Sequence, residues 1–116
     1  MSIVSTLDSL INSVDSFREE MITLMVELLK IRTVNPDGGG RGEYERALFL
    51  KRKLEGFGIK VSSHDVPGPC VPEGVRVSLT SVIDGEDDSR TLWFVAHMDT
   101  VPEGRESYGI QIRSNL

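Results

Sequence analysis

His97 and Asp99 are the residues whose types and spacing best suit chemistry in this sequence. They lie in the stretch LWFVAHMDTVPEG (residues 92–104), where an apolar run ends in two polar residues separated only by Met98. Because side chains alternate along a strand, His97 and Asp99 are expected on one side and Met98 on the other. A histidine can bind zinc through one ring nitrogen while a carboxylate fixes the other nitrogen. The pattern therefore predicts either a metal ligand with its orienting aspartate or an ordinary polar pair at a strand end.

Three other features have simpler interpretations than chemistry. His64 comes just before a proline-rich loop and is interpreted as a solvent-exposed turn residue. The glycines at 38–40 lack the Lys-Ser/Thr ending and the preceding strand of a phosphate-binding loop, so we expect a flexible connection there. Cys70 is the single cysteine, which excludes an intrachain disulfide and indicates a reducing compartment.

Three helices are expected before the region that contains His97. The spacing of apolar residues predicts helices over residues 3–14 and 17–32, and Ser16 with Glu19 would form a capping box at the start of the second. Pro36 and the glycines interrupt this period, which returns over residues 43–55. Four residues of the third helix are expected to face inward: Tyr44, Ala47, Leu48 and Leu54.

Three strands are expected after the helices, over residues 59–66, 75–85 and 91–96. The third is a continuous apolar run, which is typical of a strand covered on both faces in an α/β sheet. The predicted fold class is therefore α/β, with N-terminal helices packed on a small, incomplete sheet that has an unprotected edge. Ligands bind at the carboxyl ends of strands in such sheets, which favours the position of His97.

Composition excludes several classes of protein. The chain has 116 residues, enough for one domain, and a net charge of −5, which argues against a general nucleic-acid binder. Its apolar stretches are too short to span a membrane, and no secretory signal opens the sequence. We therefore expect a soluble cytoplasmic protein that contacts neither nucleic acid nor membrane.

The stretch LWFVAHMDTVPEG resembles the first metal-binding motif of the co-catalytic zinc amidohydrolases. This family includes acetylornithine deacetylase, succinyl-diaminopimelate desuccinylase, aminoacylase and several carboxypeptidases and dipeptidases. Two further stretches resemble the same family, one over residues 28–61 and one over residues 71–85, although Val77 and Ser78 stand where Pro-Asn is more usual. The resemblance extends over about residues 17–104. Five residues fit the motif itself: Ala96, His97, Asp99, Val101 and Pro102.

The resemblance implies a metal ligand at His97 and a catalytic role for Asp99 in orienting its imidazole. Intact family members hold two zinc ions, for which cobalt can substitute, and hydrolyse the amide bond of an N-acyl amino acid or small peptide. The bridging aspartate, the glutamate base and the remaining ligands would follow beyond this chain. Residues 1–104 are thus expected to be the N-terminal part of a catalytic domain that is inactive alone. The rival hypothesis is a non-catalytic assembly module, whose exposed strand edge pairs with another copy or with a separately encoded catalytic half.

The tail over residues 105–116 diverges from the family, which has a Trp and then Asp-Pro-Phe at this place. One permitted coding sequence for YGIQIRSNL (residues 108–116), read from the third base of its first codon, encodes WDTDPFKP. We therefore expect a frameshifted, prematurely stopped copy of a longer hydrolase gene.

Overall fold

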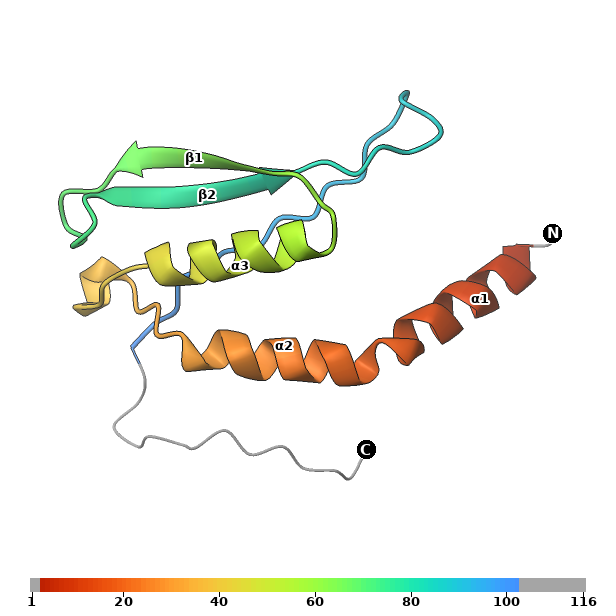
Figure 1. Cartoon of the computed structure of the whole chain (residues 1–116), viewed down its shortest axis with the longest axis horizontal. Helices are drawn as coiled ribbons and strands as arrows, with labels where there is room; N and C mark the ends of the chain where they lie inside the picture. The colour runs from red at the N-terminus through yellow and green to blue at the C-terminus, as the bar shows by residue number, and fades with distance from the viewer. Residues whose placement is uncertain (1–2, 103–116) are drawn as a thin grey trace. The chain divides into compact units, whose positions relative to one another are not determined.

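The computed structural model describes residues 3–102 (Figure 1), and this part of the chain divides into two compact units. One unit covers residues 3–31 and the other residues 32–102, and each is described by itself. The predicted tail over residues 105–116 lies outside the described residues and stays a prediction. None of the described helices is long and apolar enough to cross a membrane.

The first unit consists of two consecutive helices, α1 (Ile3–Ser16) and α2 (Arg18–Lys30). Both predicted helices are therefore confirmed. The capping box is wrong, because α1 continues through Ser16 and the N-cap of α2 is Phe17, which makes no side-chain capping bond. The Ser16 hydroxyl instead donates to the Ser13 carbonyl at 2.6 Å, a local bond typical of a serine within a helix.

The second unit packs helix α3 (Tyr44–Gly56) against an antiparallel hairpin of β1 (Val61–Pro67) and β2 (Val75–Ser81) (Figure 1). The hairpin pairs Val61 with Ser81 at one end and Pro67 with Val75 at the other. The predicted mixed α/β class is confirmed by this unit. Its described core is small and consists of side chains from the helix, the hairpin and the two loops beside them: Val34, Ala47, Val61, Val71 and Val77.

The inward face predicted for α3 is only partly correct. Ala47 is buried, and Tyr44 and Leu54 are half-buried, but Leu48 is 41% exposed. The sheet that α3 covers has only two strands, so it is too narrow to bury a wide apolar stripe.

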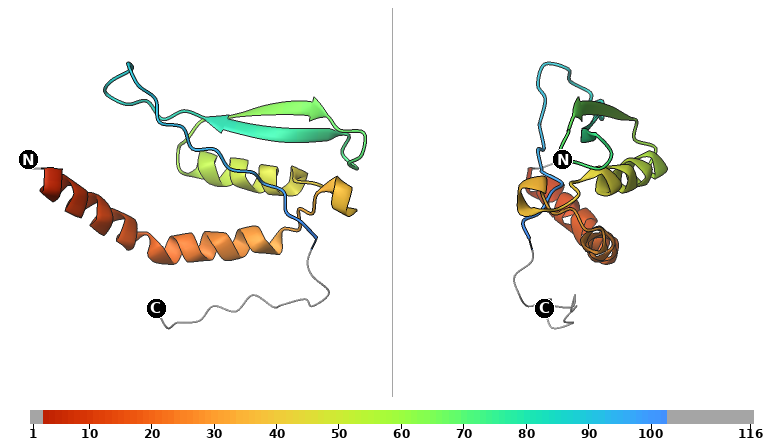
Figure 2. Two further views of the ribbon diagram at one scale, coloured as in Figure 1. Left: turned by 180° about the vertical axis from the view of Figure 1, so that it is seen from behind. Right: turned by 90° about the vertical axis from the view of Figure 1, so that its left-hand side faces the viewer.

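The third strand was predicted over residues 91–96, and this prediction is wrong. Figure 2 shows the chain leaving β2, turning, and returning in an extended course without strand pairing. Leu92, Trp93, Phe94 and Val95 are between 74% and 90% exposed. A buried strand needs neighbouring strands for its backbone groups, and the described residues supply none for this segment.

Candidate functional site

The site begins at a single parallel β-bridge between Val34 and Thr100. The Asn35 amide donates to the Thr100 carbonyl, and the Thr100 amide donates to the Thr33 carbonyl, each at 2.9 Å. This bridge holds the end of the extended segment beside the loop after α2. It therefore brings Asp99 next to Asn35.

The glycine-rich loop around this bridge, for which we expected a flexible connection, has a hydrogen-bonded course. A short 3₁₀ turn, η1 (Pro36–Gly38), follows Asn35, whose side-chain oxygen accepts from the Asp37 amide at 2.8 Å. The amides of Gly38 and Gly40 both donate to the Asn35 carbonyl. A Cβ on Gly40 would lie 1.9 Å from the Val34 carbonyl oxygen, so only glycine fits there.

The structure brings His97 and Asp99 together, although the strand expected to carry them is absent from the described residues. The Nδ1 atom of His97 lies 3.1 Å from Oδ1 of Asp99 and 2.8 Å from the Asp99 carbonyl oxygen. The His97 side chain is 83% exposed, and that of Asp99 is 25% exposed. The imidazole is thus held through one nitrogen, while no other described group is within hydrogen-bond distance of Nε2.

The other carboxylate oxygen of Asp99 is held by Asn35. The Asn35 side-chain amide donates to Oδ2 at 2.8 Å, and Nη2 of Arg76 lies 3.9 Å from the same oxygen. The Asn35 hydrogen bond is the main cause that holds the pKa of Asp99 below its usual range; burial opposes it, and the hydrogen bond from His97 lowers the pKa further. The carboxylate is therefore kept charged and fixed at both oxygens.

Arg76 also binds a second carboxylate, on the residue that precedes α3. Its Nε lies 2.6 Å from Oε1 of Glu43, whose side chain is 7% exposed. The Glu43 hydrogen bond raises the pKa of Arg76, so the guanidinium remains charged. From the first turn of α3, Arg46 donates to the Met98 carbonyl at 2.9 Å. Helix α3 and strand β2 therefore both contribute to fixing residues 98–99.

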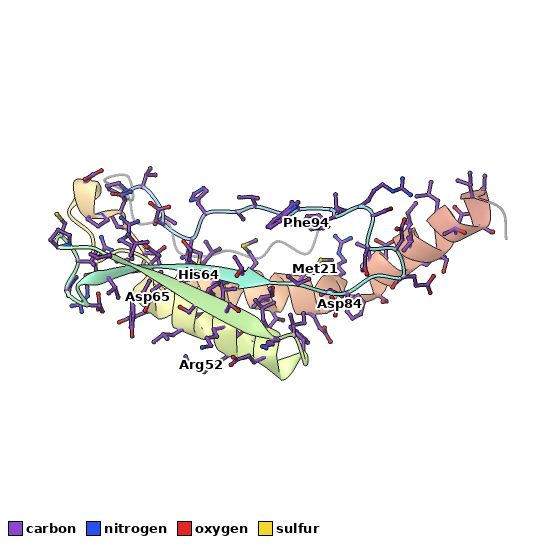
Figure 3. The ribbon with its side chains drawn as sticks, turned by 90° about the horizontal axis from the view of Figure 1, so that it is seen from above. Met21, Arg52, His64, Asp65, Asp84 and Phe94 are labelled. Atoms are coloured by element: carbon purple, nitrogen blue, oxygen red, sulfur yellow. The ribbon has the colours of Figure 1, made fainter. Side chains whose placement is uncertain are left out.

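The remaining candidates lie apart from this cluster. His64 is exposed on β1, as labelled in Figure 3, and its Nε2 lies 2.9 Å from the Thr80 hydroxyl across the hairpin. It therefore lies on a strand and not in a turn. Cys70 is exposed in the loop that joins the two strands.

Sequence reasoning missed the residues that hold Asp99. Asn35 had one usable signal, because an Asn before Pro often accepts a backbone hydrogen bond at the start of a turn. Glu43 and Arg76 had none, because their pairing depends on how α3 packs on the hairpin.

Among the described residues, His97 is the side chain that the sequence predicted as a metal ligand. Zinc sites usually take about three or four protein ligands. Among residues 3–102, no group of three or more His, Cys, Asp or Glu residues is placed to hold a metal ion. His97, whose Nδ1 is fixed, could serve as one ligand of such a site. The described residues do not provide the other ligands beside it.

Comparison with known proteins finds metallohydrolases among the relatives. The chain is 37% identical over 94 residues to an uncharacterized metallohydrolase of Methanocaldococcus jannaschii, a match that covers 74% of this chain and 22% of that protein. It is 38% identical over 95 residues to an uncharacterized metallohydrolase of Methanococcus maripaludis, with 77% and 22% covered. The chain thus spans only about a fifth of the length of these curated relatives. No protein-family model and no solved structure matches it. The two homologues support a metallohydrolase family for this chain.

Proposed function

We propose that this chain supplies the first metal ligand of a zinc-dependent hydrolase that cleaves the amide bond of an N-acyl amino acid or small peptide. The observation that carries the proposal is the His97–Asp99 pair, in which Nδ1 faces the aspartate and Nε2 is left for a metal. This is the arrangement in which a carboxylate orients a metal-binding histidine.

The residues of the site have separate roles in this proposal. His97 would hold one zinc ion, and Asp99 keeps the imidazole in place. When bound, the metal would supply polarisation of a substrate carbonyl and a lower pKa for an attacking water. The described residues contain neither the other ligands nor an assigned general base, so the proposed activity requires further polypeptide.

A chimera of the Methanocaldococcus jannaschii relative tests this function. The matching segment of that metallohydrolase is replaced by the matching segment of this chain, and zinc- or cobalt-dependent release of amino acid is followed with N-acetyl and N-succinyl amino acids and dipeptides. We expect activity that is lost in His97→Ala and kept in His64→Ala, the matched control on β1. Full activity of the His97→Ala chimera would contradict the proposal. Metal-dependent release by the purified 116-residue chain would contradict its catalytic incompleteness.

A second candidate function is that of an assembly module, and the extended apolar segment favours it. Phe94, labelled in Figure 3, belongs to a run of four large apolar side chains that are mostly exposed (residues 92–95). An extended segment with unpaired backbone groups can add to the edge of a sheet in another polypeptide. A mass that rises with concentration in light scattering would support pairing with another copy, and a monomer at all concentrations would contradict it.

A further inference from the structure

We infer that Asn35 is a positioning residue, which fixes the Asp99 carboxylate so that His97 keeps its hydrogen on Nδ1 and presents an unprotonated Nε2. The metal-binding consequence rests on the proposed function. The positioning itself rests only on contacts between the described residues.

The partners of His97 determine where the hydrogen of the neutral imidazole lies. Its Nδ1 faces the Asp99 carbonyl oxygen at 2.8 Å and the Asp99 carboxylate oxygen at 3.1 Å. A carbonyl and an ionised carboxylate can only accept hydrogen bonds, so Nδ1 must be the donor. The lone pair of the neutral ring is then on Nε2, which is the nitrogen turned away from Asp99.

The partners of Asn35 determine the orientation of its amide in the same way. Its side-chain oxygen accepts from the backbone amide of Asp37 at 2.8 Å, so the amide nitrogen is the group that faces Oδ2 of Asp99 at 2.8 Å. The backbone of Asn35 is itself bonded to Thr100 and to two glycines of the loop. Asn35 is therefore fixed through both its side-chain oxygen and its backbone, which holds the amide donor in place beside Asp99.

Arg76 does not replace Asn35 in this role. Its guanidinium is 3.9 Å from Oδ2, beyond hydrogen-bond distance, and its Nε is bound to Glu43 at 2.6 Å. Arg76 contributes charge near Asp99, whereas Asn35 makes the directional contact.

Two substitutions of Asn35 separate its two roles. Asn35→Asp keeps an oxygen that can accept from the Asp37 amide but removes the donor to Asp99 and places a second carboxylate beside it. Asn35→Ala removes both contacts. Asn12→Ala, an exposed position of α1 in the other unit, is the matched control.

The test is the tautomer of His97, read from long-range ¹H–¹⁵N NMR spectra of the metal-free 116-residue chain at about pH 8.5, well above the usual histidine pKa. We expect the Nδ1–H form in the wild type and in Asn12→Ala, and a partial shift toward the Nε2–H form in both Asn35 variants, because the Asp99 carbonyl oxygen remains as an acceptor for Nδ1 when the carboxylate is no longer fixed. His64 is the internal reference and should not change. The backbone amide signals of residues 38–42 report whether the loop is kept in Asn35→Asp.

The outcomes distinguish this inference from the proposed function. A wild-type His97 in the Nε2–H form, or an unchanged tautomer in Asn35→Asp and Asn35→Ala, would overturn the positioning role. The expected tautomer shift combined with an active His97→Ala chimera would leave positioning intact and overturn the metal-ligand function. If Asn35 positions Asp99 and His97 binds metal, Asn35→Asp should weaken cobalt binding to the chimera by about tenfold, as changes beside metal ligands commonly do.

Discussion

At the scale of single residues, the buried carboxylate of Glu43 needs a partner cation to offset its loss of hydration. It is almost fully buried just before α3, and Arg76 is the cation that binds it. Removing one partner of such a pair leaves a buried charge without compensation, which costs more than an exposed ion pair contributes.

Arg76→Ala is therefore expected to lower the free energy of unfolding by about 1–3 kcal/mol in urea titrations. The control is Arg41→Ala, because Arg41 is 71% exposed and lies 3.3 Å from Glu73. Exposed pairs of this kind contribute about 0–1 kcal/mol. Equal losses in the two variants would contradict the importance of burial at Glu43.

Asp99 gives the site a defined dependence on pH. Its folded pKa is below the usual value, chiefly because Asn35 donates to it. Its charged form therefore stabilises the fold above the unfolded pKa of about 3.9, and this contribution is lost as the pH falls through the folded pKa. We expect Asp99→Asn to reduce stability at about pH 7 and to have a smaller effect at about pH 3. If the stability difference between Asp99→Asn and the wild type were the same at both pH values, the charge of Asp99 would not contribute to folding stability.

At the scale of elements, the hairpin and α3 depend on very few buried side chains. Val77 is one of five buried apolar residues in the described core and lies in β2. Val77→Ala is expected to cost about 1–3 kcal/mol, which is a large part of the stability of so small a core. Val66→Ala on β1, where the side chain is 58% exposed, should change stability by less than about 0.5 kcal/mol. Circular dichroism during urea titration measures both, and similar effects would contradict the assigned core.

Local patterns predicted the elements well where the determining contacts are local. Helical periodicity found α1, α2 and α3, and alternation found β1 and β2, within a few residues of their observed bounds. The failures have non-local causes. An apolar run over residues 91–96 predicts a buried strand only when other strands flank it, and Ser16 can cap α2 only if α1 ends before it. The same distinction applies to the site. His97 and Asp99 could be predicted as a pair because they are close in sequence, whereas the contact of Asn35 with Asp99 could not, because the two residues are 64 positions apart.

At the scale of the whole molecule, the single tryptophan reports on the exposed segment. Trp93 is 74% exposed, so its fluorescence in the isolated chain should be quenched by acrylamide almost as strongly as that of free tryptophan. If residues 92–95 pair with further polypeptide, the emission should move to shorter wavelength and quenching should fall. Strong protection in a dilute monomer would contradict the exposed course of this segment.

The parallel bridge that joins Val34 to Thr100 also has a consequence for the order of folding. The hairpin closes a short loop between Gly68 and Gly74, whereas the bond from Asn35 to Asp99 closes one of 64 residues. Closing the longer loop costs about 2 kcal/mol more chain entropy, by the logarithmic dependence on length. The hairpin is therefore expected to form early and the bridge late, and the amide hydrogens of Asn35 and Thr100 should exchange with solvent before those of β2. The contacts that fix Asp99 beside His97 are therefore expected to form late in folding and to be lost early in unfolding.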